Sequence, residues 1–336
     1  MMASLYDWLV SVQQASPHLM KALLAGGLVS TTCALIGCFI VLRRTSFLAD
    51  AVAHSMLAGV VAGYLLMKLV YGDSAHTGAM LIGSIISGII TVAMVSFVSR
   101  ASRVKEDAVI GIMYTGIFAL GGVMVSFFSD VIHIDLYHFV IGSLLGVGDA
   151  DLWMMGTVSC VVVVFIVMTF RWLQIITFDR VMAASIGIPV VLMDYLLTMS
   201  TSLVVVSGVR MVGVILVVGL LIAPAATAYL LCDRLRNMLW VSALLGWTGF
   251  LMGYIASECM NVAPGSAIVV VLTAQFMLVF IIAPRYGLLA DWRRRLTALP
   301  QQEVEDILGS VLRADGEALS LQQIAGYLDK RPERLR

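Results

Sequence analysis

Residues 43–55 read RRTSFLADAVAHS and interrupt two long apolar runs. The second half of this stretch places Asp50 and His54 four residues apart, so a carboxylate and an imidazole lie on one face of the helix that restarts there. If the apolar runs cross a membrane, such an ionisable pair is costly, because charged groups lose their hydration in hydrocarbon. The pair is therefore our first candidate for a functional site.

The composition predicts an integral membrane protein. About 60% of the residues are hydrophobic and 12% are charged, compared with about 45–50% and 25% in soluble domains. The 21 basic and 21 acidic residues cancel, so no net charge points to nucleic acid as a partner. The five cysteines include no C-x-x-C pair, which argues against a disulfide framework or a zinc knuckle.

Apolar runs long enough to cross a ~30 Å hydrocarbon core recur along the chain. They lie near 19–42, 51–70, 78–98, 108–128, 152–170, 190–206, 213–232, 238–256 and 266–283. We predict an all-α polytopic membrane protein with about nine transmembrane helices. The segment 138–148 is short and glycine-rich, so we interpret it as a re-entrant or interfacial piece.

Three regions follow from this pattern. Residues 1–17 form an N-terminal interfacial segment, 18–290 a transmembrane domain, and 291–336 a polar cytoplasmic tail that we expect to be helical. Small residues such as Gly59 and Gly83 recur in the spans and predict closely packed helices.

Basic residues cluster in alternate connections, which predicts that these connections are cytoplasmic. The clusters fall at 43–44, 100–105, 171–180, 234–236 and 285–295. The other connections are then external, at 71–77, 129–137, 207–211 and 257–265.

The longest internal connection predicted to be cytoplasmic, residues 172–190, reads WLQIITFDRVMAASIGIPV. Its middle is helix-like from Asp179 to Ile186 and ends at Gly187, with Pro189 close behind. Two interpretations stay open from these residues alone, a docking surface for a partner and a plain surface helix that joins two spans.

Six separated strings together resemble a known family. They are SFLADAVAHSMLAGVVAGYL, EDAVIGIMYTGIFALG, IGSLLGVGDADL, ITFDRVMAASIGI, VGVILVVGLLIAPAATAYLL and APGSAIVVV. In this order they are similar to blocks of the zinc/manganese/iron ABC-importer permeases, over about residues 19–286. The resemblance implies the type II, cobalamin-importer-like fold in a bacterial inner membrane. It also implies two ATPase subunits, a second permease chain, identical or paralogous, and an extracytoplasmic solute-binding protein.

The resemblance also assigns roles to matching residues. It makes Asp50 and His54 a metal pair, and Pro224 a hinge, although a packing kink explains this proline equally well. The expected ATPase-coupling residues are Asp179, Arg180, Ala183, Ala184 and Gly187. A carboxylate and an imidazole suit Mn²⁺, Zn²⁺ or Fe²⁺, carried as a transported ion rather than a permanent cofactor. Without the resemblance, Asp50 also fits a helix cap and His54 a packed polar residue.

Weaker candidates lie elsewhere. His133 and His138 are possible ligands, but we prefer a loop that contacts the binding protein, because no regular helix puts both on one face. Glu258 is a candidate entrance ligand or docking contact, and we interpret Asp194 as structural. In the tail, EDILGSVLRADGEALSLQQIAGYL resembles the first half of a metal-dependent-repressor winged helix, from which we expect a regulatory or ATPase-contacting appendix and no binding to nucleic acid.

The sequence thus favours the permease subunit of an ATP-driven divalent-metal importer. It has no G-x-x-x-x-G-K-[ST] phosphate loop, so we expect a transporter subunit, not an enzyme, with ATP hydrolysis on a separate chain. Two alternatives stay open, a self-sufficient secondary metal transporter or channel and a membrane-bound metal sensor that acts through the tail. The residues do not select one metal.

Overall fold

A computed structural model describes residues 17–71, 77–128, 146–283 and 287–290. The predictions for residues 1–16, for His133 and His138, and for the tail at 291–336 lie outside these ranges, as does most of the segment 138–148. The chain divides between Phe280 and Ile281 into two units. The helices and contacts below belong to the first unit. The exception is the last two residues of α12, Ile281 and Ile282, which fall in the second unit.

All regular elements within the described ranges are helices. They are α2 (Pro17–Leu42), α3 (Ser46–Tyr71), α4 (Thr77–Ala101), α5 (Glu106–Phe127), α7 (Asp149–Phe178), α8 (Arg180–Ser185), α9 (Val190–Val212), α10 (Val214–Leu231), α11 (Leu235–Met260) and α12 (Pro264–Ile282). Nine of these described helices, all except the short α8, are long and apolar enough to cross a membrane. The prediction of an all-α polytopic protein with about nine spans is confirmed.

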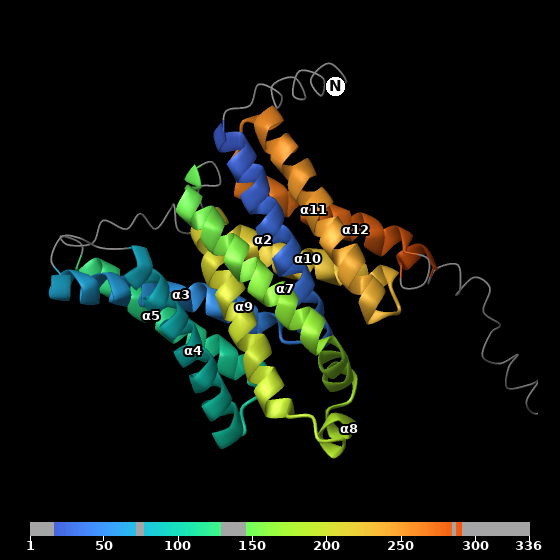
Figure 1. The fold of residues 1–336 in the computed structure, drawn as a ribbon, viewed down its shortest axis with the longest axis horizontal. Helices are drawn as coiled ribbons and strands as arrows, with labels where there is room; N and C mark the ends of the chain where they lie inside the picture. The colour runs from blue at the N-terminus through green and yellow to red at the C-terminus, as the bar shows by residue number, and fades with distance from the viewer. Residues whose placement is uncertain (1–16, 72–76, 129–145, 284–286, 291–336) are drawn as a thin grey trace, which may run out of the picture. The chain divides into compact units, whose positions relative to one another are not determined.

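The helix α2 lies at the centre of one group of helices. It packs against α7, α9, α10 and α11, and Figure 1 shows it running between them. Its side chains Val29, Cys33, Ile36 and Phe39 are fully buried. The contact with α10 is close because Gly37 faces the carbonyl oxygen of Leu221, and an added β carbon would overlap that oxygen.

The helices α3, α4 and α5 form a second group, and α9 contacts both α3 and α4. Gly59 of α3 and Gly83 of α4 meet backbone to backbone, so a side chain on either would overlap the carbonyl oxygen of the other. Gly121 of α5 approaches the backbone of Ala58 in the same way. The prediction that small residues allow close packing is confirmed here, and these contacts fix the position of α3.

A single glycine separates α9 from α10, where we expected an external connection at residues 207–211. That expectation is wrong, because α9 continues to Val212 and the side chains of Ser207 and Met211 are buried. Gly213 has a φ of 85° and ends the helix. Since glycine adopts positive φ without a steric penalty, the chain can leave one helix and enter the next without a loop.

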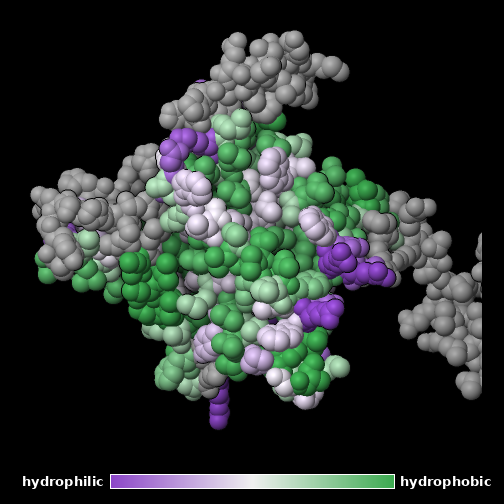
Figure 2. Space-filling view, viewed as in Figure 1, coloured by the Kyte–Doolittle hydropathy of each residue, from purple (hydrophilic) through white to green (hydrophobic). Residues whose placement is uncertain are grey.

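Large hydrophobic side chains cover the described surface. Leu69, Phe97 and Val123, for example, are 87%, 73% and 66% exposed. In Figure 2 hydrophobic residues spread across most of the face in view, and the most hydrophilic ones gather near its margins. In water such a surface would be an aggregation hazard, whereas lipid tails solvate it. The chain is therefore a multi-pass membrane protein.

Candidate functional site

The first candidate site is the pair Asp50 and His54 on α3. Because α3 begins at Ser46, Asp50 lies in its second turn and His54 one turn later. The Nδ1 atom of His54 lies 3.3 Å from Oδ1 of Asp50 and 3.0 Å from the backbone carbonyl oxygen of Asp50. The two side chains are 35% and 31% exposed. The expected placement on one helix face is therefore correct.

This geometry determines which atoms of the pair can bind a ligand. Both oxygens near Nδ1 are acceptors, so they favour the histidine tautomer that carries its proton on Nδ1. The lone pair of Nε2 is then free for a metal ion. Histidine ligands in proteins are commonly oriented in this way by a carboxylate or a carbonyl group behind the ring. The pair can offer one imidazole nitrogen and one carboxylate oxygen.

Two aromatic side chains of α5 border the pair. The ring of His54 lies 5.9 Å from the ring of Tyr114 and 5.7 Å, edge to face, from that of Phe118. Sequence reasoning did not single out these residues. Their spacing of four within EDAVIGIMYTGIFALG was the available signal, since it places both on one face of a helix. They limit the directions from which an ion can reach the imidazole.

Neighbouring helices hold this part of α3 in place. The hydroxyl of Ser87 on α4 donates a hydrogen bond of 2.8 Å to the carbonyl oxygen of Ser55. The next residue of α4, Gly88, lies close to both Val52 of α3 and Ser202 of α9. The segment that bears Asp50 and His54 is thus set by contacts with α4 and α9.

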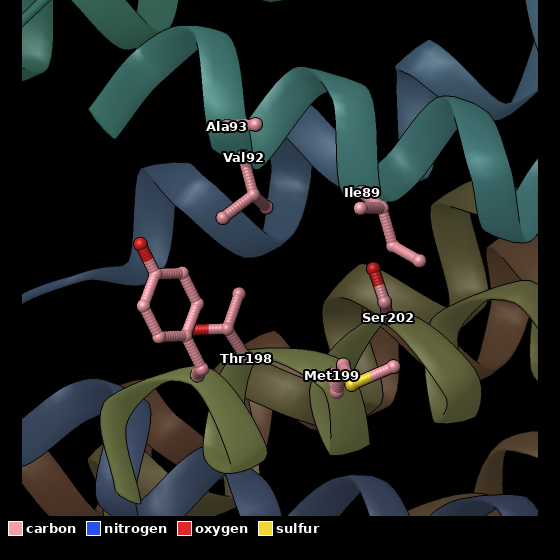
Figure 3. A pocket seen from close by; sticks show the side chains of 7 residues that line it. Ile89, Val92, Ala93, Thr198, Met199 and Ser202 are labelled. Atoms are coloured by element: carbon pink, nitrogen blue, oxygen red, sulfur yellow. The ribbon is translucent and has the colours of Figure 1, made fainter. Parts of the chain in front are cut away.

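A small cavity of about 80 Å³ lies between α4 and α9. Figure 3 shows side chains of the two helices facing one another across it, and the hydroxyl of Ser202 on α9 points toward α4. The lining is mostly apolar and consists of Ile89, Val92, Ala93, Tyr195, Thr198, Met199 and Ser202. This lining offers no ligand set for a metal ion. The cavity leaves α4 and α9 less tightly packed than α3 and α4.

Among the residues that the structure describes, Asp50 and His54 have no third ligand beside them. No group of three or more His, Cys, Asp and Glu side chains occurs there. Glu258 is exposed near the end of α11 and does not join the pair. One chain therefore supplies two protein ligands at this position, too few to enclose an ion by themselves.

The second candidate site is α8, which forms where the sequence predicts it. Asp179 precedes the helix, and its Oδ1 atom accepts a hydrogen bond of 2.9 Å from the backbone N–H of Met182. At the other end Gly187 has a φ of 84°, its N–H bonds to the Ala184 carbonyl, and the N–H of Ile188 bonds to the Ala183 carbonyl. These bonds form a Schellman motif and stop the helix after two turns.

One face of α8 packs against the protein and the other is open. Ala183 is buried against Ile176 at the end of α7 and Met193 at the start of α9. Val181 and Met182 are 82% and 56% exposed, so they form an apolar surface that a partner can contact. An open groove beside the helix is lined by Ala184, Gly187, Ile188, Pro189, Val190, Val191, Leu192 and Tyr195. Of the five coupling residues predicted from sequence, Asp179, Arg180, Ala184 and Gly187 are exposed and Ala183 is buried.

Pro224 lies buried in the middle of α10. Because proline has no N–H, the carbonyl of Leu220 cannot receive its usual helical hydrogen bond. This freed carbonyl fits either a hinge or a fixed packing kink, so the predicted hinge stays a prediction.

Comparison with known proteins gives consistent matches. The model of the ABC 3 transport family matches residues 15–283. The manganese transport system membrane protein MntC of Halalkalibacterium halodurans is 40% identical over 277 residues, which cover 82% of this chain and 91% of the relative. The manganese import system permease protein ScaB of Streptococcus parasanguinis is 34% identical, over 80% of this chain and 91% of the relative.

A solved structure has the same fold. It is PsaBC from Streptococcus pneumoniae in complex with Fab, with a TM-score of 0.73 and 33% sequence identity. The match covers 85% of this chain and 98% of that one.

Proposed function

Because the chain belongs to the ABC 3 transport family, we propose that it imports manganese as the membrane permease of an ATP-driven transporter. Its role as a metal-importer permease follows from the family and from relatives matched over almost their full length. The choice of manganese is supported by relatives named as manganese transport proteins. A carboxylate and an imidazole are ligands compatible with that ion, as they are with Zn²⁺ and Fe²⁺.

The observation that carries the proposed transport site is the pair Asp50 and His54. The pair, about one-third exposed, offers a free imidazole nitrogen next to a carboxylate, and two aromatic rings stand beside it. Two ligands bind an ion weakly, which suits a pathway where each ion must also leave. If a second permease chain faces the first across a twofold axis, two such pairs supply four ligands. We place the transported ion at this position.

The permease works with ATPase and solute-binding partners, as an importer of this family requires. We propose two ATPase subunits that contact the exposed face of α8 through Val181 and Met182. We also propose that a second permease chain completes the pathway, and that the complex lies in a bacterial inner membrane with α8 on the cytoplasmic side. The basic residues at 171–180 and 43–44 support this orientation.

Reconstitution tests the proposal directly. We would place the permease, its ATPase subunits and its binding protein in proteoliposomes and measure uptake of radioactive Mn²⁺ with and without ATP. We expect uptake only with ATP, and weaker competition by Zn²⁺ and Fe²⁺ than by unlabelled Mn²⁺. Equal uptake without ATP would instead identify a secondary transporter or channel. Preference for Zn²⁺ or Fe²⁺ would replace manganese as the cargo.

The sensor alternative has its own test. Deleting residues 298–336 removes most of the predicted tail and leaves the membrane helices intact. We expect the truncated chain to keep ATP-dependent uptake of Mn²⁺. Transport at the full rate would exclude a protein whose activity depends on the tail, whereas loss of uptake in a correctly assembled complex would favour the sensor.

A further inference from the structure

An ion pair joins the turn before α3 to the start of α9. The guanidinium of Arg43 bonds through Nη1 to Oδ1 of Asp194, at 2.5 Å. Its Nε atom donates a second hydrogen bond, of 3.3 Å, to the hydroxyl of Thr177 in the last turn of α7. The side chain of Arg43 is only 6% exposed. One arginine therefore connects the α2–α3 turn with α7 and α9.

The other oxygen of the same carboxylate faces α8. Oδ2 of Asp194 lies 3.6 Å from Nη2 of Arg180, the first residue of that helix. Arg180 is 59% exposed, so this contact is weaker and more easily broken than the one with Arg43. Asp194 thus lies between a buried partner in the α2–α3 turn and a largely exposed partner on α8.

The pair with Arg43 is tightly held because the arginine is buried. Burial lowers the pKa of the Arg43 guanidinium, and the nearby Asp194 carboxylate opposes this effect. Arginine nevertheless stays charged in proteins, so it needs a counter-charge close by. The Nη2 atom of Arg43 is buried and has no hydrogen-bond partner. A shift of α9 would therefore move the charge that stabilises this guanidinium, and Arg43 would have to follow or find another acceptor.

The turn that holds Arg43 leads directly into the proposed transport site. Arg44 adopts a φ of 59°, its N–H bonds to the Val41 carbonyl, and the N–H of Thr45 bonds to the Ile40 carbonyl. This is a Schellman motif, which fixes the path of the chain between α2 and α3. Helix α3 starts at the next residue, and Asp50 follows within its second turn.

We propose that Asp194 couples α8 to the transport site, as a positioning residue that passes movement of α8 to the start of α3. When an ATPase subunit displaces α8, the first turn of α9 moves with it, because Ala183 is packed against Met193. Asp194 carries Arg43 along, and the rigid turn transmits the displacement to Asp50 and His54. The inference rests on the proposed function, since it needs an ATPase at α8 and an ion at the pair.

The test separates hydrolysis from transport. In the reconstituted complex we would measure ATP hydrolysis and Mn²⁺ uptake together for Asp194→Asn, which keeps an oxygen for Arg43 but removes the charge. We expect hydrolysis to stay near the wild-type rate, and Mn²⁺ transported per ATP to fall about tenfold. A residue that only stabilised the fold would lower both rates in proportion to the amount of assembled complex. Asp194→Glu restores the carboxylate and should recover most of the transport.

A matched control exists at a second ion pair. Lys21 and Asp149 are joined at 2.6 Å between α2 and α7, away from α8 and from the α2–α3 turn. Asp149→Asn makes the same chemical change and should leave Mn²⁺ transported per ATP unchanged. If Asp194→Asn assembles poorly, Arg180→Gln tests the same link from its exposed side and should lower the same ratio to a smaller extent.

The outcomes distinguish this inference from the proposed function. If the wild-type complex takes up no Mn²⁺ with ATP, the proposed function fails and the coupling role fails with it. If the wild-type complex transports Mn²⁺ and Asp194→Asn transports as much per ATP, only the coupling role of Asp194 is overturned. Equal loss of hydrolysis and uptake in the assembled variant would overturn it as well.

Discussion

Two polar pairs lie on either side of the first residue of α3, and they are built differently. Asp50 and His54 are one turn apart on the same helix, about one-third exposed, and 3.3 Å apart. Arg43 and Asp194 are 151 residues apart in sequence, 2.5 Å apart in space, and the arginine is almost fully buried. The first pair needs only a helix to form, whereas the second exists only after α2 and α9 have packed.

This difference indicates different roles. His54 keeps a ring nitrogen that its partner does not use, so the first pair can accept and release an ion. Arg43 and Asp194 form an ion pair with each other, so the second pair holds helices together. We therefore expect substitutions at the first pair to affect transport with little change in stability, and substitutions at the second pair to affect both the stability of the fold and the Mn²⁺ transported per ATP. The following predictions test that separation, in order of decreasing effect.

The largest effect should come from Arg43→Ala. This change removes the buried arginine and leaves the Asp194 carboxylate without its main partner, so we expect the free energy of unfolding to fall by about 3 kcal/mol. Titration with SDS in mixed micelles measures it. Arg180→Ala is the matched control, because Arg180 is largely exposed and its contact with Asp194 is longer. Equal unfolding midpoints for Arg43→Ala and the wild type would show that the pair does not hold the helices.

His54→Ala should affect transport strongly and stability little. Removing the imidazole that His54 supplies to the proposed site should reduce Mn²⁺ uptake by about 100-fold, while Asp50→Asn, which keeps an oxygen ligand, should reduce it by about tenfold. Uptake is measured in proteoliposomes and stability in the same SDS titration. Unchanged uptake in His54→Ala and Asp50→Asn would exclude the pair as a transport site. A large loss of stability in His54→Ala would instead assign it a structural role.

Gly83→Val tests the packing that positions the first pair. A valine at this residue would overlap the carbonyl oxygen of Gly59, so α3 and α4 must separate, with an expected loss of about 1–3 kcal/mol in the free energy of unfolding. Uptake of Mn²⁺ should fall as well, because α3 carries Asp50 and His54. Gly122→Val is the control, since a β carbon at Gly122 meets nothing within 4 Å. Equal effects of the two valines would contradict close packing as the cause.

The sequence predicted those parts of the molecule that depend on local pattern. The nine spans follow from the length of apolar runs, and the common face of Asp50 and His54 follows from the period of a helix. The end of α8 was predictable because Gly187 can adopt positive φ. The connection expected at 207–211 was placed too early, because Gly213 redirects the chain and the apolar pattern does not mark that point.

Contacts between distant residues could not be predicted in this way. Tyr114 and Phe118 lie beside His54 only because Gly121 lets α5 approach α3. Asp194 was interpreted as a structural residue, and nothing in its neighbourhood in the sequence indicates Arg43 as its partner. Such pairs depend on the angle and register of packed helices, which one sequence specifies only through the complete fold.

The smallest effect should come from the turn that separates the two pairs. Arg44 and Gly187 occupy the same position in two Schellman motifs, with φ of 59° and 84°, but only one of them is glycine. A left-handed conformation costs a residue with a side chain roughly 1–2 kcal/mol. Glycine avoids this cost, but its greater conformational freedom in the unfolded chain offsets roughly 0.5–1 kcal/mol of the benefit. Arg44→Gly should therefore raise the free energy of unfolding by less than about 1 kcal/mol, measured by SDS titration. Gly187→Ala should lower it by a similar amount.

Since Arg44 is exposed and belongs to neither pair, Mn²⁺ uptake should be unchanged in Arg44→Gly. The two backbone hydrogen bonds that hold the turn can form with glycine at this position as well. A loss of uptake without a loss of stability would mean that these two bonds alone do not keep the turn rigid enough to move α3.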